Sequence, residues 1–166
     1  MADPSVIDLK KATIYLIDGA TTPAKLEIKM DEGNLTFTRK FNREYRKNRG
    51  LLDTVRDGDE EPLEVSFTGR FSSIVSDDGE SITVEEFLTK AGRGSALVTT
   101  ATDACAPYAC DILVEIEQEC GTLRDEVHLF EEFRVESLGG DYKAGQLSVA
   151  GKCNRTKVTA YRTALA

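Results

Sequence analysis

The sequence predicts a mainly β protein: an antiparallel β-sandwich or barrel of about seven strands with one packed α-helix. Three observations lead to this fold class. Apolar and polar residues alternate with a period of two in several segments, most clearly in residues 63–68 and 111–120. Turn residues such as Asp-Gly and Gly-Gly separate these segments. Only one short stretch, residues 84–91, has the spacing of an amphipathic helix.

Length and charge restrict the function further. A chain of 166 residues is long enough to bury a core as one domain. The formal net charge of −8 argues against general affinity for nucleic acid, which needs a basic surface. No run reaches the roughly 18 apolar residues of a membrane span. Residues 1–11 lack a basic region followed by an apolar run, so we expect no secretory signal and a product made in the cytoplasm.

The first strands are predicted from short apolar or alternating runs. They cover residues 12–17, 24–31 and 35–41. The first run ends at the turn sequence Asp18-Gly19. The next strand, residues 63–75, ends before Asp77-Asp78-Gly79.

The helix is predicted over residues 84–91 by its start signal and its apolar face. Thr83 and Glu86 have the spacing of a capping box, in which each side chain bonds the other's backbone amide. Gly92 and Gly94 follow and favour a helix end.

The second half of the chain returns to strands. A short strand is predicted at residues 95–100, and residues 111–120 and 127–135 form a hairpin turning at Gly121-Thr122. Residues 146–153 form a further strand, which residues 158–161 extend. Residues 1–11 and 162–166 are expected to be a terminal arm and tail.

The longest polar stretch, residues 39–62, has opposite charges in its two halves. Its basic residues are Arg39, Lys40, Arg43, Arg46, Lys47 and Arg49. Its acidic residues are Asp53, Asp57, Asp59, Glu60 and Glu61. A loop this long is uncommon and is usually functional or disordered. If the two groups lie on different faces, copies can join head-to-tail into rings or filaments; the alternative is a mobile loop whose charges pair internally.

The sequence contains no recognisable catalytic arrangement. His128 is the only histidine, and no nucleophile motif, P-loop or dinucleotide fingerprint accompanies it. The four cysteines, Cys105, Cys110, Cys120 and Cys153, leave three alternatives open: free thiols, a Cys105–Cys110 disulfide across a turn, or a zinc site. We therefore expect a protein that is not an enzyme and that needs no cofactor or metal.

One segment resembles a known family. Residues 43–67 pass from a basic run through Gly50-Leu51-Leu52-Asp53 and the acidic turn Asp57-Gly58-Asp59 into an apolar strand. With the helix and the hairpin around Gly121, this pattern resembles phage tail tube proteins, in particular the major tail protein of long, non-contractile tails. The resemblance extends over about residues 12–161.

The resemblance implies a structural virion protein, made in the host cytoplasm, whose single domain (residues 1–166) forms stacked hexameric rings. DNA would pass through this tube without specific binding, no membrane would be involved, and other tail proteins would close its ends. Residues 39–62 would then reach the adjacent ring. The expected inter-ring contacts are Arg43, Arg46, Arg49, Asp53, Asp57, Asp59 and Glu60. The alternatives are a tail terminator, a distal tail protein, the tube of a contractile tail or secretion system, or a monomeric binding module.

A tube that conducts DNA favours a negative wall, because phosphates are repelled from it. Acidic residues alternate along both strands of the predicted hairpin. The expected lumen-facing residues are Glu115, Glu117 and Glu119 on one strand, with Glu126, Glu132 and Glu136 on the next. The alternative is an ordinary solvated face.

Overall fold

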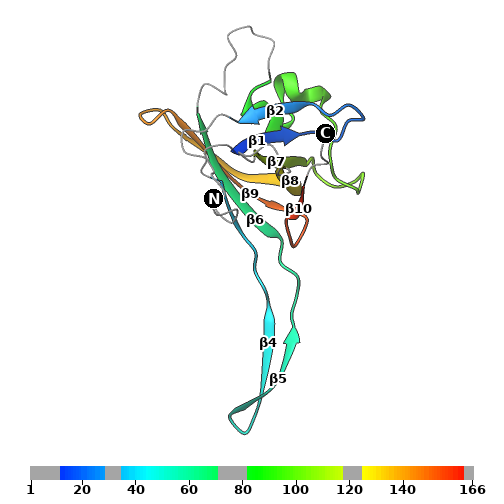
Figure 1. The fold of residues 1–166 in the computed structure, drawn as a ribbon, viewed down its shortest axis with the longest axis vertical. Coiled ribbons are helices and arrows are strands. Elements are labelled where there is room, and N and C mark those ends of the chain that lie inside the picture. Colours follow the sequence, from blue (N-terminus) through cyan, green and yellow to red (C-terminus); the bar gives the residue numbers. More distant parts are fainter. Residues whose placement is uncertain (1–11, 29–34, 71–81, 118–124, 163–166) are drawn as a thin grey trace, which may run out of the picture.

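A computed structural model describes residues 12–28, 35–70, 82–117 and 125–162 (Figure 1). Within these ranges the chain is mainly antiparallel β structure with one short α-helix, as predicted. The elements are β1 Ala12–Ile17, β2 Lys25–Ile28, β3 Leu35–Thr38, β4 Arg43–Asn48, β5 Leu51–Asp57, β6 Leu63–Arg70, α1 Val84–Thr89, the 3-10 helix η3 Gly92–Ala96, β7 Cys110–Ile116, β8 Glu126–Asp141, β9 Gln146–Cys153 and β10 Thr159–Arg162. The predicted terminal arm, the turn at Gly121, Glu119 and Cys120 lie outside the described residues.

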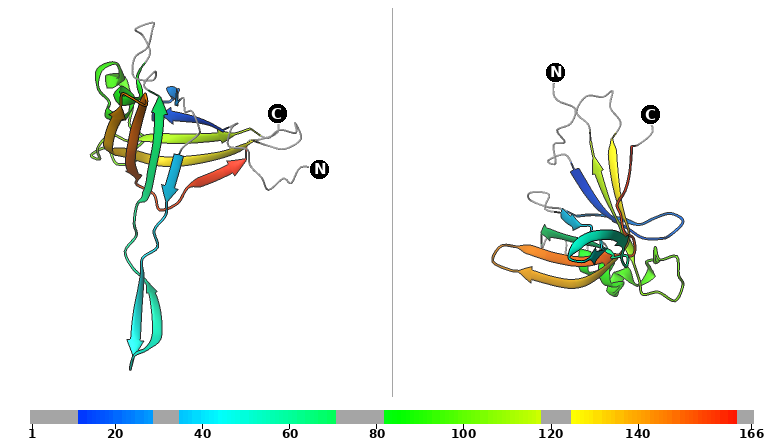
Figure 2. Two further views of the ribbon diagram at one scale, coloured as in Figure 1. Left: turned by 90° about the vertical axis from the view of Figure 1, so that its left-hand side faces the viewer. Right: turned by 90° about the horizontal axis from the view of Figure 1, so that it is seen from below.

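Eight strands form one sheet in the order β2-β1-β7-β8-β9-β6-β3, with β10 paired to β8. The long strand β8 changes partner along its length: it pairs with β10 over residues 126–129 and with β9 over residues 133–141. The sheet therefore has two halves that share β8, and they run in different directions (Figure 2).

The core lies between these halves and α1. Strand β6 alternates as its sequence predicts, with Leu63, Val65 and Phe67 buried. Phe130 and Phe133 of β8 and Phe87 of α1 are each about 1% exposed. Full burial of such a side chain contributes about 1.5–3 kcal/mol, so this cluster dominates the stability of the fold.

Helix α1 forms where the capping signal predicts it. The Thr83 hydroxyl accepts from the Glu86 amide, and the Glu86 carboxylate accepts from the Thr83 amide. Six residues are too few for an isolated helix, so packing of Val84, Phe87 and Leu88 holds it in place. The helix ends at Lys90 in the left-handed conformation, slightly earlier than predicted.

Two predicted strand assignments are wrong. Residues 95–96 belong to η3 and residues 97–100 form no strand, because the chain folds back against α1 at Gly94. Strand β10 does not extend β9 but pairs with β8. The first part of β8 has an edge that β9 does not cover, and β10 occupies it.

The prediction of a long loop at residues 39–62 is also wrong, because most of this segment is a two-stranded ribbon. Strands β4 and β5 pair from Arg43↔Asp57 to Asn48↔Leu51. Arg49 and Gly50 have φ values of 51° and 85°, the positive pair that a two-residue hairpin turn requires. The ribbon stands away from the rest of the molecule (Figure 1). Both of its faces are exposed, so its sequence lacks the apolar alternation that identifies a half-buried strand.

Gly151 of β9 is required by the close passage of β8. A Cβ atom at this position would lie 2.1 Å from the Arg134 carbonyl oxygen and 2.8 Å from the Phe133 ring. We expect Gly151→Ala to lower the free energy of unfolding by about 1–3 kcal/mol in urea denaturation. Gly139→Ala is the matched control, because nothing lies within 4 Å of a Cβ there. Equal stability of the two variants would contradict this packing.

Candidate functional site

The ribbon β4–β5 presents large apolar side chains to solvent. Tyr45 and Val55 pair directly across it and are 60% and 56% exposed. Leu52 lies opposite Lys47, two residues along β4 from Tyr45, and is 68% exposed; Leu51 at the tip is 76% exposed. An isolated two-stranded hairpin is marginally stable in water, and contiguous exposed apolar groups mark interaction surfaces. The ribbon therefore has the properties of a surface that a partner covers.

The charges expected to contact the adjacent ring all lie on or beside this ribbon. Arg43 forms an ion pair with Asp57 directly across the strands, so part of the charge is paired within the chain. Arg46 lies opposite Thr54, and Arg49 lies in the turn. Neither arginine forms an ion pair within the described part of the chain. Most of the basic groups thus lie on β4 and the turn, and Asp53 and Asp57 lie on the neighbouring strand β5.

The base of the ribbon is held by a second set of contacts. Asn42 Nδ2 donates to the Asp59 carbonyl oxygen and to Glu61 Oε1, both at 3.0 Å. The Gly58 amide donates to the Asn42 carbonyl oxygen at 3.0 Å. Lys40 Nζ lies 2.7 Å from Glu64 Oε1. This hydrogen bond raises the pKa of Lys40 and lowers that of Glu64. These contacts join the ribbon to the sheet and set its direction.

A second polar feature is a buried carboxylate at the point where β8 changes partner. Glu131 and Glu132 together oppose Asp111 of β7, so β8 has a bulge there. Glu132 has φ of 54°, and its side chain is 3% exposed. Its amide donates to Asp111 Oδ1 at 3.0 Å. A left-handed conformation is unusual for a residue with a side chain, so the surrounding contacts must stabilise it.

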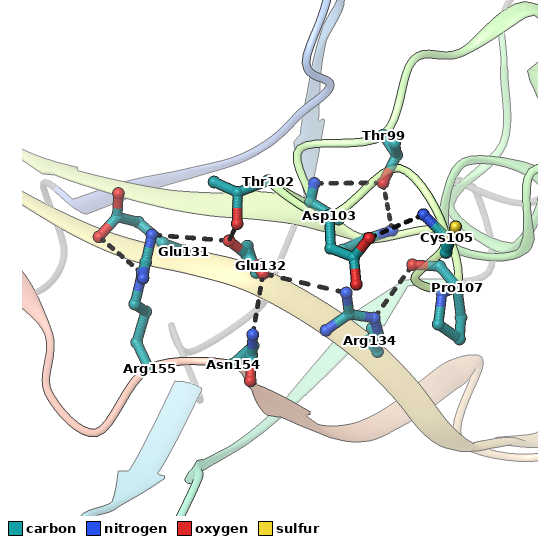
Figure 3. Close-up of polar contacts among 12 residues, drawn as sticks. Thr99, Thr102, Asp103, Cys105, Pro107, Glu131, Glu132, Arg134, Asn154 and Arg155 are labelled. Atoms are coloured by element: carbon teal, nitrogen blue, oxygen red, sulfur yellow. Dashed lines mark hydrogen bonds and ion pairs between the residues drawn. The ribbon is translucent and has the colours of Figure 1, made fainter.

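Glu132 is enclosed by partners from three segments (Figure 3). Oε1 accepts from the Thr102 hydroxyl at 3.3 Å and lies 3.5 Å from a nitrogen of Arg155. Oε2 accepts from Asn154 Nδ2 at 3.2 Å and lies 3.9 Å from a nitrogen of Arg134. Arg134 also donates to the Pro107 carbonyl oxygen. The carboxylate thus joins both halves of the sheet to the loop at residues 99–107.

The predicted lumen-facing role of Glu132 is therefore wrong, because this side chain is buried. The signal for the network was present in the sequence: Phe130 and Phe133 are separated by two acids, which breaks the period of two and indicates a bulge. Its partners Thr102, Asn154 and Arg155 are distant in sequence, and no local pattern identifies them.

The other predicted lumen acids do not form one wall. Glu115 pairs with Val127, and Glu126 pairs with Ile116, so Glu115 and Glu126 lie on opposite faces of the sheet. Glu126 Oε1 lies 2.7 Å from Nε2 of His128. Glu117 is exposed, and its role in a lumen stays a prediction.

The pKa of Asp111, which lies beside the bulge, is raised. Burial raises the pKa of this carboxyl above its ordinary value, and the hydrogen bond from the Glu132 amide offsets part of that rise. Glu131 and Glu132 raise the pKa further by charge repulsion. A raised pKa in the folded state means that ionised Asp111 destabilises the fold, and that this cost disappears as the pH falls through the folded pKa.

We expect Asp111→Asn to be at least as stable as the wild type at pH 7. Asparagine retains an oxygen that can accept from the Glu132 amide and has no charge to desolvate. The difference in stability between Asp111→Asn and the wild type should shrink as the pH falls through the raised pKa of Asp111, because the wild-type carboxyl then becomes neutral too. Urea denaturation at a series of pH values measures this. A variant that is less stable at pH 7 and gains relative stability toward acid pH would contradict it.

The described cysteines are free thiols. Cys105 is exposed, whereas Cys110 and Cys153 are buried on either side of Phe133. The Cys105–Cys110 disulfide does not form. Burial raises the pKa of Cys153 to about 12 and that of Cys110 further, so both stay protonated and unreactive. Among the described residues, no group of His, Cys, Asp or Glu is arranged to hold a metal ion. No described helix has the length and apolar character needed to cross a membrane.

Comparison with known proteins identifies the fold through structures alone. No family model matches the chain, and no curated protein matches it. The anti-feeding prophage cap, the AFP tube terminating cap, is 13% identical with a TM-score of 0.61, covering 98% of this chain and 95% of that chain. The sheath/tube terminator of the PVC extracellular contractile injection system is 10% identical with a TM-score of 0.57, covering 97% and 99%.

The PVC sheath-tube complex in its extended state supplies a further match, 10% identical with a TM-score of 0.56 over 96% of this chain and 94% of that chain. Identities this low show the fold alone. The fold is tail-tube-like, as the sequence resemblance predicts. Two of these three matched structures come from a contractile injection system, whereas the sequence resemblance pointed to non-contractile tails.

Proposed function

We propose that this protein is a ring-forming structural subunit of the tube of a contractile, phage-like particle. The observation that carries the proposal is the ribbon β4–β5, which projects from a tail-tube-like fold and exposes Tyr45, Leu52 and Val55 on one face. In an assembly, the adjacent ring would cover this face. The matches to contractile systems favour this function over the major tail protein of a non-contractile tail.

Apolar contacts would provide the adhesion between rings and charges would set their register. Exposed ion pairs contribute only about 0–1 kcal/mol each, whereas burying an exposed side chain such as Tyr45 contributes more. Arg46 and Arg49 then select the orientation of the ribbon on its partner and make stacking sensitive to salt. Asp53, Asp59 and Glu60 remain proposed acidic partners of this contact.

The remaining parts of the proposal rest on the resemblance to tail tube proteins. Six copies would form a ring over a single domain, the cargo would pass through the lumen, and other particle proteins would close the tube ends. The role would be structural rather than enzymatic, within a particle assembled in the host cytoplasm.

A tube terminator or cap is the second candidate. Two of the matched structures are a tube terminating cap and a sheath/tube terminator. A terminator would use the same ribbon to dock on the last ring of a tube, but its rings would not stack on one another.

Negative-stain electron microscopy of the purified protein, over a range of concentrations and salt, tests both candidates. Hollow tubes that shorten or dissociate at high salt would establish the tube subunit. Single rings that do not stack would establish the terminator. Monomers throughout the series would contradict both and favour a monomeric binding module.

A further inference from the structure

The turn between β8 and β9 presents a tyrosine side chain to solvent. Tyr142 is 92% exposed. It follows Asp141, whose Oδ1 accepts from the Lys143 amide at 2.9 Å and from the Ala144 amide at 3.3 Å. Because these bonds between side chain and backbone fix the turn, Tyr142 and Lys143 are held at a defined place beyond the end of the sheet. We call residues 141–145 the tyrosine turn.

A hollow of about 340 Å³ lies at the base of the ribbon. Phe41 in its wall is 58% exposed, and the guanidinium groups of Arg39 and Arg43 lie 4.5 Å and 5.4 Å from the centre of its ring. Asp59 and Glu60 also line the hollow, and within the described part of the chain neither forms an ion pair. The hollow therefore combines an aromatic wall with two acids that a base can still reach. We call it the base groove.

The tyrosine turn and the base groove lie at opposite ends of the same strands. Strands β6 and β9 pair from Leu63↔Cys153 to Arg70↔Gln146. The ribbon precedes Leu63, whereas the tyrosine turn precedes Gln146, so the length of β6 separates them (Figure 1, where the turn is orange). The eight residues of β6 span roughly 25 Å at about 3.3 Å per residue. The tyrosine turn therefore cannot enter the base groove of its own subunit.

This placement suits a contact between successive subunits. Two different surfaces at opposite ends of a molecule join copies head-to-tail, and such contacts repeat along an assembly. If the ribbon extends along the adjacent ring, its base faces the near end of a subunit in that ring. That near end is the one opposite the second subunit's own ribbon, where its tyrosine turn lies.

The two surfaces are also complementary in chemistry. An aromatic ring packs favourably against another ring and over a guanidinium group, and the base groove provides Phe41 with two arginines beside it. Lys143 forms no ion pair among the described residues, and it adjoins Tyr142 as Glu60 adjoins Asp59 in the groove. Tyrosine and arginine are the residues that most often dominate binding energy when a pocket of a partner buries them.

We propose that the tyrosine turn of one subunit binds in the base groove of a second copy of this chain in the adjacent ring. Tyr142 is the anchor against Phe41, and Lys143 pairs with the acids of the groove. This inference rests on the proposed ring-forming function. It adds a second contact to the one that the apolar face of the ribbon makes.

Cross-linking between subunits tests the contact. Lys143→Cys and Glu60→Cys are combined in one chain in a Cys105→Ser, Cys120→Ser background, because the two remaining cysteines are buried. A short bifunctional maleimide is added to the assembled particles, which are then separated on a denaturing gel. We expect a ladder of linked chains, because each subunit carries one site at either end. Each single-site variant should give no product larger than a pair.

The matched control combines Lys143→Cys with Ser95→Cys, since Ser95 is exposed in η3 and does not line the base groove. This variant should give no ladder. Stacked rings in which Lys143→Cys, Glu60→Cys gives no ladder, or in which the control gives the same ladder, would overturn the inference and leave the proposed function standing. Wild-type rings that never stack would overturn it and establish the terminator. Failure of the wild type to form any assembly would instead contradict the proposed function on which the inference rests.

Substitution of the anchor is a second test that leaves the charges in place. We expect Tyr142→Ser to raise the protein concentration at which rings stack by at least about tenfold, because loss of an anchor removes much of the binding energy. Tyr142→Phe keeps the ring and should stack like the wild type. The thermal unfolding of the unassembled subunit should be the same in both variants, since this side chain is 92% exposed. Stacking of Tyr142→Ser at the wild-type concentration would overturn the inference.

Discussion

Replacing Glu132 with alanine is expected to lower the free energy of unfolding by about 2–4 kcal/mol. The substitution leaves the Thr102 hydroxyl, the Asn154 amide and two arginines without their shared acceptor. Arg134 and Arg155 are partly exposed and can regain water, which keeps the loss below that of a fully buried ion pair. Urea denaturation at neutral pH measures the change.

Two further substitutions at this position separate the carboxylate from the backbone strain. Glycine normally destabilises a strand more than alanine does. With φ at 54°, we expect the reverse order, with Glu132→Gly more stable than Glu132→Ala by roughly 1 kcal/mol. Glu132→Gln retains the size and an acceptor oxygen, and should cost less than Glu132→Ala.

Glu131→Ala is the control for the bulge itself. Glu131 lies beside Glu132, but its side chain is 34% exposed and its contacts are at the surface. We expect a change below about 1 kcal/mol. If Glu132→Ala and Glu131→Ala are equally stable, the buried carboxylate does not hold the two halves of the sheet together.

The double substitution Tyr45→Ser, Val55→Ser is expected to abolish stacking of rings while leaving the fold intact. Both side chains are more than half exposed in the single subunit, so their loss should change the free energy of unfolding by less than about 0.5 kcal/mol. In an assembly they would be the buried centre of the ribbon contact, where truncation of a few anchors removes most of the binding energy. Electron microscopy and sedimentation velocity measure the loss of stacked rings.

A cross-strand pair of opposite charges on the same ribbon provides the matched control, because its removal leaves the net charge unchanged. Glu44 and Arg56 pair across the strands one position away from Tyr45 and Val55. We expect Glu44→Ser, Arg56→Ser to assemble like the wild type. Normal tubes from the Tyr45→Ser, Val55→Ser variant would show that the apolar face of the ribbon is not the ring contact.

Reversal of Arg46 and Arg49 to glutamate should impair stacking most at low salt, where their charges are least screened.

Local patterns predicted the parts of the fold that depend on local physics. The period of two in residues 63–68 identified β6, because side chains on a strand alternate between core and solvent. The Thr83–Glu86 spacing identified the start of α1, because both capping bonds form within one turn. The resemblance in residues 43–67 identified a tail-tube-like fold, although not the class of particle that provides the structural matches.

Local patterns failed where the outcome depends on residues far apart in the chain. The ribbon was predicted as a loop, since β4 and β5 have no buried face to impose alternation. Glu126 and Glu132 were grouped with Glu115 as a single wall, but Glu126 pairs with Ile116 on the face opposite Glu115, and at the bulge the Glu132 side chain is buried. A register shift by one residue moves every following side chain to the other face of the sheet.

Local patterns are enough to predict a mainly antiparallel β protein with one capped helix, no recognisable catalytic motif and a segment with opposite charges in its two halves. Those properties follow from composition, short-range periodicity and capping, which neighbouring residues control. The pairing of the strands in three dimensions was needed to show that the charged segment is a ribbon with an apolar face, that Glu132 is buried, and that the ribbon and the β8–β9 turn lie at opposite ends of the same strands. No local pattern reveals these features, because strand pairing joins residues distant in sequence and the register of that pairing decides which side chains meet.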